Sequence, residues 1–292
     1  MARDPKLEVG ALNLRIPETH NRDYRALIRR IADLRRGVRV YGDSYVAIQL
    51  YLPEEDNLGV IAKYTEIDID GDWFDLDDFD AATPEKLSEI SIPDALRPNL
   101  ARFYFQLFPD EHILVVSTYS ESKSLSARSV LRYMKEAVSS PEIMREFGRV
   151  EVDVVQSFRG VEELLSMPHL KEVRLIIRRP NSDDLSKDLA AIIEERLRQQ
   201  NGDEYEEAIR SKDSGDLEPN ERTKKLGQVA AENGEVKTKS LVNGIITDHQ
   251  AADQPLIEKT KYKPDESEMA VFKSLADRIR DVIARVRRSR DE

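Results

Sequence analysis

The chain of 292 residues contains no cysteine. This absence excludes disulfide bonds, zinc and iron–sulfur centres held by thiolates, and a thiol nucleophile. No uncharged apolar run approaches the roughly 20 residues that a membrane-spanning helix needs. The first residues carry charges of both signs and no apolar segment follows them, which is not typical of a signal peptide. We therefore expect a soluble, cytoplasmic protein that does not associate with membranes.

Recognisable catalytic motifs are also missing. The four histidines, His20, His112, His169 and His249, are never spaced as metal ligands on a helix would be. No zincin motif, nucleophile elbow or glycine-rich phosphate loop occurs. The sequence therefore predicts no catalytic residue, no cofactor and no metal ligand. It favours a non-enzymatic protein without deciding the question.

The charged side chains are unevenly distributed along the chain, whose formal net charge is −11. Residues 21–40 contain seven arginines and two aspartates, a net charge of +5. Residues 272–290 contain seven lysines and arginines and two aspartates, again +5. Residues 68–80 contain seven aspartates and no basic residue, a net charge of −7. Because local charge decides which partners a surface attracts, these three segments are the first candidates for binding.

The N-terminal third, residues 1–98, is predicted to form one helix followed by strands. Apolar residues recur at three- and four-residue steps over residues 21–36 and leave arginines on the other face, which predicts an amphipathic helix. β-branched and aromatic residues then predict a β-meander. Asp70 and Gly71 predict the turn of a hairpin, because both accept positive φ. The strands are expected at 39–41, 45–52 and 59–69, and a short helix at 84–90.

Residues 99–180 alternate strands and helices in the order β-β-α-β-α-β. This order predicts a loosely ferredoxin-like unit, in which helices cover a mixed sheet. The strands are expected at 101–108, 112–118, 150–155 and 173–178, and the helices at 124–138 and 161–167.

Residues 181–292 are predicted to be mainly helical and to end in a basic helix. The polar segment 249–266, with its two prolines, is typical of a linker. The helices are expected at 185–197, 203–210, 221–231 and 268–288, with one strand at 236–242. The whole chain is therefore expected to be an α+β protein, with mixed and largely antiparallel sheets covered by helices, divided at residues 98 and 180.

The aspartates of residues 68–80 partly match a calcium-binding loop. Asp68, Asp70 and Asp72 fit its first, third and fifth positions. The match then fails, because Trp73 stands where the loop needs glycine and Phe79 where it needs glutamate. We expect a solvated acidic hairpin, which leaves open a weak divalent-cation site or a surface for a basic partner. The candidate partner-binding residues are Asp70, Asp72, Asp75, Asp77 and Asp78.

The two basic helices are the main functional lead. Arginine stays charged and donates paired hydrogen bonds to phosphate, so an arginine face can follow a nucleic-acid backbone. Basic residues are not interleaved with aromatic ones, which favours duplex DNA over a single strand. We predict a homo-oligomeric protein that binds double-stranded DNA without sequence specificity. The candidate residues are Arg22, Arg25, Arg29, Arg36, Arg278, Arg285 and Arg288.

Three alternatives stay open. The arginines can simply be solvated, as charged residues on helix faces usually are. The acidic hairpin and the basic terminal helix can instead make the protein an interaction module of a larger complex. A metal-dependent nuclease would use Glu235-Val236-Lys237 as a Glu-x-Lys motif, with Asp213 or Asp216 as a further carboxylate.

Three segments of the C-terminal half precede the charged terminal helix: residues 173–184 (VRLIIRRPNSDD), 208–216 (AIRSKDSGD) and 230–236 (AAENGEV). Their order resembles that of the phage-exclusion protein RexA and of a related bacterial and prophage family of unknown function. The resemblance implies a dimeric, non-enzymatic DNA-binding sensor or effector in defence against phage. It brings no catalytic residue, and the basic residues in its matching loop are Arg210 and Lys212.

Overall fold

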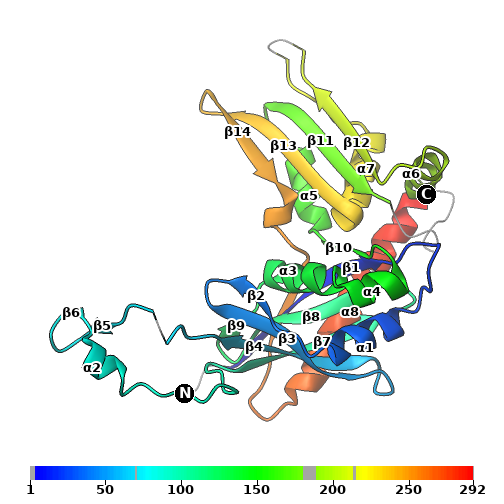
Figure 1. The fold of residues 1–292 in the computed structure, drawn as a ribbon. Coiled ribbons are helices and arrows are strands. Elements are labelled where there is room, and N and C mark those ends of the chain that lie inside the picture. Colours follow the sequence, from blue (N-terminus) through cyan, green and yellow to red (C-terminus); the bar gives the residue numbers. More distant parts are fainter. Residues whose placement is uncertain (1–3, 70, 180–188, 213–214, 292) are drawn as a thin grey trace.

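The computed structural model describes residues 4–69, 71–179, 189–212 and 215–291. Two antiparallel sheets organise the chain, and helices pack on both of them (Figure 1). This confirms the α+β class, with largely antiparallel sheets covered by helices. No helix in the described part of the chain has both the length and the apolar composition to cross a membrane.

The larger sheet has nine strands, and the N-terminal strand is the second one along its main path. Its strands are β1 (Lys6–Arg15), β2 (Val38–Tyr41), β3 (Ser44–Leu52), β4 (Leu58–Thr65), β7 (Ala101–Phe108), β8 (Ile113–Ser120), β9 (Lys123–Ser124), β10 (Glu151–Val154) and β15 (Ile257–Lys261). The main path is β10-β1-β8-β7-β4-β3-β2, while β15 also pairs with β1 and β9 with β8. β1 therefore joins both ends of the chain to the sheet.

The second sheet has four strands in the order β12-β11-β13-β14. These strands are β11 (Leu170–Arg178), β12 (Glu204–Arg210), β13 (Gly234–Val242) and β14 (Ile245–Gln250). The α-helices of the described residues are α1 (Tyr24–Asp33), α2 (Pro84–Leu87), α3 (Ala127–Val138), α4 (Pro141–Phe147), α5 (Phe158–Leu165), α6 (Leu189–Gln199), α7 (Glu221–Asn233) and α8 (Glu268–Asp291). Val173, Leu175 and Ile177 of β11 share one core with the apolar residues of α5, α6, α7 and α8. This core holds the second sheet against the first.

Neighbouring residues of β8 point to opposite faces of the larger sheet, as side chains of a strand must. Ile113 and Val115 pack in the core that contains the apolar residues of α8. Leu114 and Val116 pack in the core that contains the apolar residues of α1, α3 and α4. Helices α1 and α8 therefore lie on opposite faces of the larger sheet.

Helix α1 forms as its apolar spacing predicts. Asp23 caps its first turn by accepting a hydrogen bond from the backbone nitrogen of Ala26 at 2.9 Å. Leu27, Ile28 and Ile31 are buried, so the arginines between them face outward. The expected amphipathic helix is confirmed over Tyr24–Asp33, but it is shorter than the predicted range 21–36, and Arg22 and Arg36 lie just outside its ends.

Strand β1 was not expected from the sequence. Every residue from Val9 to Arg15 is buried, because the strand lies between β8 and β10 with packed layers on both faces. A strand covered on both faces loses the alternation of polar and apolar residues that marks a half-exposed strand. Asn13 and Arg15 also interrupt its apolar run, although both are buried.

The ferredoxin-like topology predicted for residues 99–180 is not formed. Strands β7 and β8 are neighbours as expected, but β10 pairs with β1 and β11 belongs to the second sheet. Strand β1 lies between β8 and β10, so these two strands of the predicted unit do not pair with each other. The order of elements along the chain does not reveal this arrangement. The divisions at residues 98 and 180 stay a prediction.

Two interpretations of the C-terminal region were wrong. Residues 203–210 form the edge strand β12 rather than a helix, because β11 supplies the backbone hydrogen bonds that local propensity does not foresee. The expected linker 249–266 contains β15, which pairs with β1. The C-terminal portion thus adds strands to both sheets beside its helices.

The connection from β4 to β7 reaches away from both sheets (Figure 1). We call residues 66–98 the acidic arm. It carries helix α2 and a hairpin of β5 (Phe74–Asp75) and β6 (Asp80–Ala81). The hairpin turn therefore lies at residues 76–79 and not at Asp70-Gly71, where it was expected; Asp70 itself lies outside the described residues.

Candidate functional site

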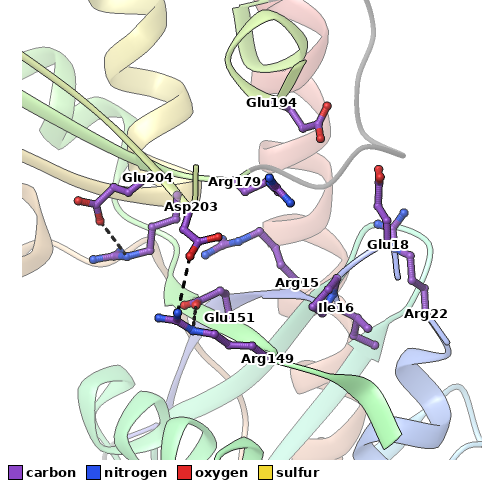
Figure 2. Close-up of a pocket in the computed structure, with 12 residues that line it drawn as sticks. Arg15, Ile16, Glu18, Arg22, Arg149, Glu151, Arg179, Glu194, Asp203 and Glu204 are labelled. Carbon is purple, nitrogen blue, oxygen red and sulfur yellow. Dashed lines mark ion pairs between the residues drawn. The ribbon is translucent and has the colours of Figure 1, made fainter. Parts of the chain in front are cut away.

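A cavity of about 200 Å³ lies where the ends of the two sheets meet. Five arginines and five acidic residues line it, together with Ile16 and Pro17. Figure 2 shows side chains from the larger sheet, such as Arg15 and Glu151, on one side and side chains from the second layer, such as Arg179 and Glu194, on the other. We call it the arginine cavity, after Arg15, Arg22, Arg149, Arg178 and Arg179.

Strand pairing brings these residues together from distant parts of the sequence. Arg15 ends β1 and stands opposite Glu151, the first residue of β10. Arg178 ends β11 and stands opposite Glu204, the first residue of β12. Because the ends of both strand pairs face the same space, a buried arginine of one sheet meets an arginine of the other.

A buried network of ion pairs links the two sheets beneath the cavity. The Asp153 carboxylate accepts hydrogen bonds from Arg15 and, at 2.7 Å, from Nη1 of Arg178. The side chains of Arg15 and Asp153 are only 5% and 7% exposed. Nη2 of Arg178 donates to Glu235 at 2.9 Å. Burial lowers the pKa of Arg178, but Asp153 and Glu235 raise it further, so the net direction is upward.

At the cavity, Arg15 and Arg179 have buried guanidinium donors that the described residues do not use. Nε and Nη1 of Arg15 are buried and have no hydrogen-bond partner among the described residues. Nε of Arg179 is in the same situation, while its Nη2 donates to the carbonyl of Gly202 at 3.1 Å. Buried polar groups are nearly always hydrogen-bonded, so each exception needs an explanation. The vacant donors of Arg15 and Arg179 are suited to an acceptor oxygen inside the cavity.

Several other charged residues around the cavity pair with one another. Arg149 pairs with Glu151 at 3.0 Å and with Asp203 at 3.8 Å. Nε of Arg178 lies 3.7 Å from Glu204. Dashed lines in Figure 2 mark these pairs. The guanidinium groups of Arg15 and Arg179 therefore remain as the donors that a further group can use.

Glu194 is the carboxylate of this cavity whose protonation is most perturbed. It projects from α6 and is buried. Burial raises the pKa of Glu194, and the nearby negative charges of Glu18 and Glu195 add to this, while Arg179 and Arg198 oppose it. Glu194 thus stays protonated to a higher pH than an ordinary glutamate, and in that form it can donate a hydrogen bond.

The arginines predicted on α1 are scattered among partners. Arg25 donates to the side-chain oxygen of Asn57 at 2.8 Å, Arg29 pairs with Glu54 at 3.3 Å, and Arg36 with Glu136 at 3.6 Å. Arg22 is the one predicted site residue that lines the arginine cavity. The arginines on and beside the outward face of α1 therefore form local hydrogen bonds and ion pairs.

The arginines predicted on α8 lie on the far face of the larger sheet from α1. Arg278 lies 3.9 Å from Glu258. Arg285 and Arg288 are exposed and form no ion pair with a residue that the structure describes. The single groove that would join the two arginine faces is not formed.

Two basic residues of α8 are largely buried rather than exposed to solvent. Arg287 and Arg290 turn inward and both pair with Glu232 of α7. Glu232 is 3% exposed, and although burial raises its pKa, the two arginines lower it to about 2. These ion pairs thus hold the C-terminal end of α8 against α7, which packs on the second sheet.

The predicted acidic residues lie on the acidic arm. Lys86 of α2 pairs with Asp75 and, at 2.8 Å, with Asp78. Hydrogen bonds from Lys86 and then from the backbone of Asp77 lower the pKa of Asp75. Asp72 and Asp77 are exposed. The arm thus presents a fixed set of carboxylates to solvent.

The nuclease arrangement is not assembled in the described chain. Lys237 pairs with Glu235 at 2.6 Å, whereas Asp216 binds Lys171 at 2.7 Å, near the other end of β11. Asp213 lies outside the described residues. Within the described ranges, no group of three histidine or acidic side chains is placed to hold a metal ion.

Sequence reasoning missed Arg15, Asp153 and Arg179. A faint signal exists, because an arginine closes an apolar strand at Arg15 and again at Arg178-Arg179. Arginine is almost never buried without a partner, so such a position indicates either a strand end or a buried pair. Local pattern alone does not say which of the two applies.

Fold and site together define an α+β protein with two packed antiparallel sheets and an arginine-lined cavity at their junction. Residues 5–277 match a domain of unknown function, DUF4747, and the chain therefore belongs to this family. No curated protein matches the chain significantly. The description of the family names no activity, so the resemblance to RexA stays a prediction.

Proposed function

We propose that this protein binds a small anionic ligand, or the anionic group of a larger one, in the arginine cavity. The observation that carries this proposal is the pair of buried, unused donors on Arg15. A guanidinium group presents its N–H donors in a planar fork that fits carboxylate and phosphate oxygens. An acceptor at this place would satisfy donors that the described residues leave vacant.

The charges of the lining residues and the volume of the cavity restrict which ligands can fit. Asp153 is shared by Arg15 and Arg178, and Arg178 has Glu235 as a further partner. Arg15 therefore has less than one full negative charge as its counterpart, and Arg179 has a neutral carbonyl. The cavity of about 200 Å³ is smaller than the several hundred Å³ of typical drug-sized sites. A group with one or two negative charges and few other atoms fits this description.

Calorimetric titration of the full chain tests the proposal. We would use inorganic phosphate, pyrophosphate, a nucleoside monophosphate and succinate as probes. We expect one saturable site for at least one of them, with affinity reduced at least tenfold in Arg179→Gln. Arg174→Gln is the matched control, because Arg174 lies on β11, which Arg179 directly follows, pairs with Glu206 at 3.2 Å, and does not line the cavity.

A bound water molecule could also satisfy Arg15, and a crystal structure would separate the two explanations. Density of an anion on the Arg15 guanidinium would support the proposal. Water at that position, together with no saturable binding of any probe at millimolar concentration, would refute it.

Duplex-DNA binding by α1 and α8 stays a prediction and so does a role in defence against phage. Support for it is weaker than for the cavity, because the two arginine faces point to opposite sides of the larger sheet. A mobility shift of duplex DNA at low salt that disappears in the double variant Arg25→Glu with Arg29→Glu would favour it. The cytoplasmic location expected from the lack of cysteine likewise remains a proposal.

A further inference from the structure

The acidic arm contributes nothing to either core. None of the described residues from Glu66 to Leu100 is buried. Its apolar side chains stand in solvent instead, with Leu76 81% exposed and Phe79 79% exposed. Exposed apolar side chains gathered on one element mark surfaces that bind another macromolecule. The arm is therefore a candidate interaction element.

Most of the negative charge of the protein belongs to this arm. Residues 66–98 contain eleven acidic residues against Lys86 and Arg97, a net charge of −9. The rest of the chain carries only −2, since the total is −11. A partner surface for the arm must therefore be basic, and it must offer a place for apolar side chains.

The arm has a defined shape despite its exposure. At its base, Arg97 pairs with Glu66 at 2.9 Å and the backbone nitrogen of Thr65 donates to the carbonyl of Pro98 at 3.0 Å. At its tip, the rings of Phe74 and Phe79 meet edge to face with centroids 5.1 Å apart. The loss of conformational entropy on docking is smaller for such a preformed hairpin than for a disordered segment.

A surface of the required kind lies next to the base of the arm. A groove of about 430 Å³ runs between β2, the end of β4 and the start of α3. Its charged lining residues are Lys63, Arg128 and Arg132, and no acidic residue lines it; Arg128 also pairs with Asp253 outside the groove. Tyr41, which is 81% exposed, offers an aromatic face. We call this surface the basic groove.

We propose that the acidic arm of one copy docks in the basic groove of a second copy of this chain. The arm leaves the body at Thr65, two residues after Lys63 of the groove, and its hairpin reaches away from that place (Figure 1). Two copies related by a two-fold axis at this edge exchange arms reciprocally, and each arm then meets opposite charge and an aromatic contact. Such an isologous interface closes as a dimer.

The absence of cysteine makes a direct test available. The single variants Leu76→Cys and Tyr41→Cys are purified separately, mixed and oxidised. We expect a disulfide-linked dimer in the mixture and far less of it in either variant alone. A double variant that forms only an internal disulfide would refute exchange between copies.

Light scattering of the full chain over a concentration series provides the second test. We expect a dimer whose dissociation constant rises at least tenfold in the double variant Leu76→Ser with Phe79→Ser. These residues are exposed, so circular dichroism should show an unchanged fold. Ile245→Ser is the matched control, because Ile245 is also an exposed apolar residue of a hairpin, 69% exposed, but lies far along the chain on β14.

Charge reversal identifies the groove as the docking place. Arg132→Glu should weaken the dimer, and mixing it with Asp77→Arg should restore association better than either variant alone. A monomer at all concentrations, a dimer that is indifferent to the arm, or an arm that binds a different basic protein would each overturn the proposal.

Discussion

The exposed arginines on and beside α1 and the arginines at the junction of the sheets differ in what surrounds them. Arg29 and Arg36 are exposed and meet glutamates at 3.3 Å and 3.6 Å. Arg15 is buried, shares one aspartate with Arg178, and still has unused donors. Water screens the first group and stabilises it at little cost, whereas the second group depends on the protein for every partner. The first group is recognised by the high density of arginine in the sequence, whereas the second is recognised by its burial in the folded structure.

This comparison teaches that a run of arginines is a poor guide to the site in this protein. Exposed pairs contribute at most about 1 kcal/mol each to stability, so the exposed arginines of α1 are free to vary with little consequence for the fold. A buried guanidinium is retained only where its charge is compensated or used. Arg15 and Arg179, which lie outside the two arginine-rich segments of the sequence, are therefore the stronger candidates for a function.

The largest expected effect concerns the buried pairs of the terminal helix. Glu232→Ala leaves Arg287 and Arg290 without their carboxylate, and we expect a loss of about 3–5 kcal/mol of unfolding free energy. Urea denaturation measures this. Glu54→Ala, which removes the exposed partner of Arg29, should change stability by less than about 1 kcal/mol. Equal losses in the two variants would erase the distinction between buried and exposed arginines.

The next effect is smaller and falls on the network between the sheets. Asp153→Asn removes the charge that Arg15 and Arg178 share, while Arg178 keeps Glu235. We expect a loss of roughly 2–3 kcal/mol, because hydrogen bonds to charged groups are each worth about 1.5–3 kcal/mol. A thermal melt in parallel with the parent chain checks this. Full stability in Asp153→Asn would mean that the sheets are held by the apolar core alone.

Glu232 also predicts how the stability of the protein responds to acid. Its folded pKa of about 2 lies below the ordinary glutamate value of 4.5, so its contribution to stability is present above pH ~4.5 and is lost as the pH falls towards 2. The slope should reach about 1.4 kcal/mol per pH unit within that range. Glu232→Gln should flatten this part of the stability curve, and an unchanged slope would contradict the assignment.

The ionisation of Glu194 is expected to change the affinity for an anion by a few-fold. Its raised pKa means that the side chain is neutral below that pKa and becomes negative as the pH rises through it. Anion binding should therefore weaken over that range, since the carboxylate faces the same cavity. Calorimetry at several pH values tests this, with Glu194→Gln expected to remove the dependence. Binding of phosphate that is indifferent to pH in the parent chain, after correction for phosphate ionisation, would argue against Glu194 as a neighbour of the ligand.

The smallest effect is expected on the face of α1. Arg29→Gln should alter unfolding free energy by less than about 0.5 kcal/mol, because the lost pair is exposed and screened. It should also leave phosphate binding unchanged, since Arg29 does not line the arginine cavity. A larger effect on either measurement would assign the helix face a role that its surroundings do not indicate.

Elements with a clear local pattern were predictable from the sequence. The 3.6-residue period of Leu27, Ile28 and Ile31 predicts α1, and the apolar residues of 124–138 predict α3. Strands β3, β7 and β8 carry β-branched and aromatic residues between turns. Each of these elements needs only its own residues to be recognised.

The candidate site could not be predicted in this way. Arg15 and Arg178 are 163 positions apart, and the position of one relative to the other depends on two strand pairings that no local pattern specifies. A helix was expected over residues 203–210, but β12 forms there. This difference also comes from a distant strand pairing, because β11 supplies the backbone partner of β12. Burial of Arg287 and Arg290 depends on where α7 places Glu232.

The sequence by itself determined the α+β class, the apolar faces of the main helices and the segregation of charge into an acidic segment and two basic ones. These properties follow from the spacing and the ionisation of neighbouring residues. Only the tertiary structure decided that the basic helices lie on opposite faces and that arginines from distant parts of the sequence share a cavity. Contacts between distant strands are selected by burial of the whole core, and this free energy is a property of the complete fold rather than of any segment.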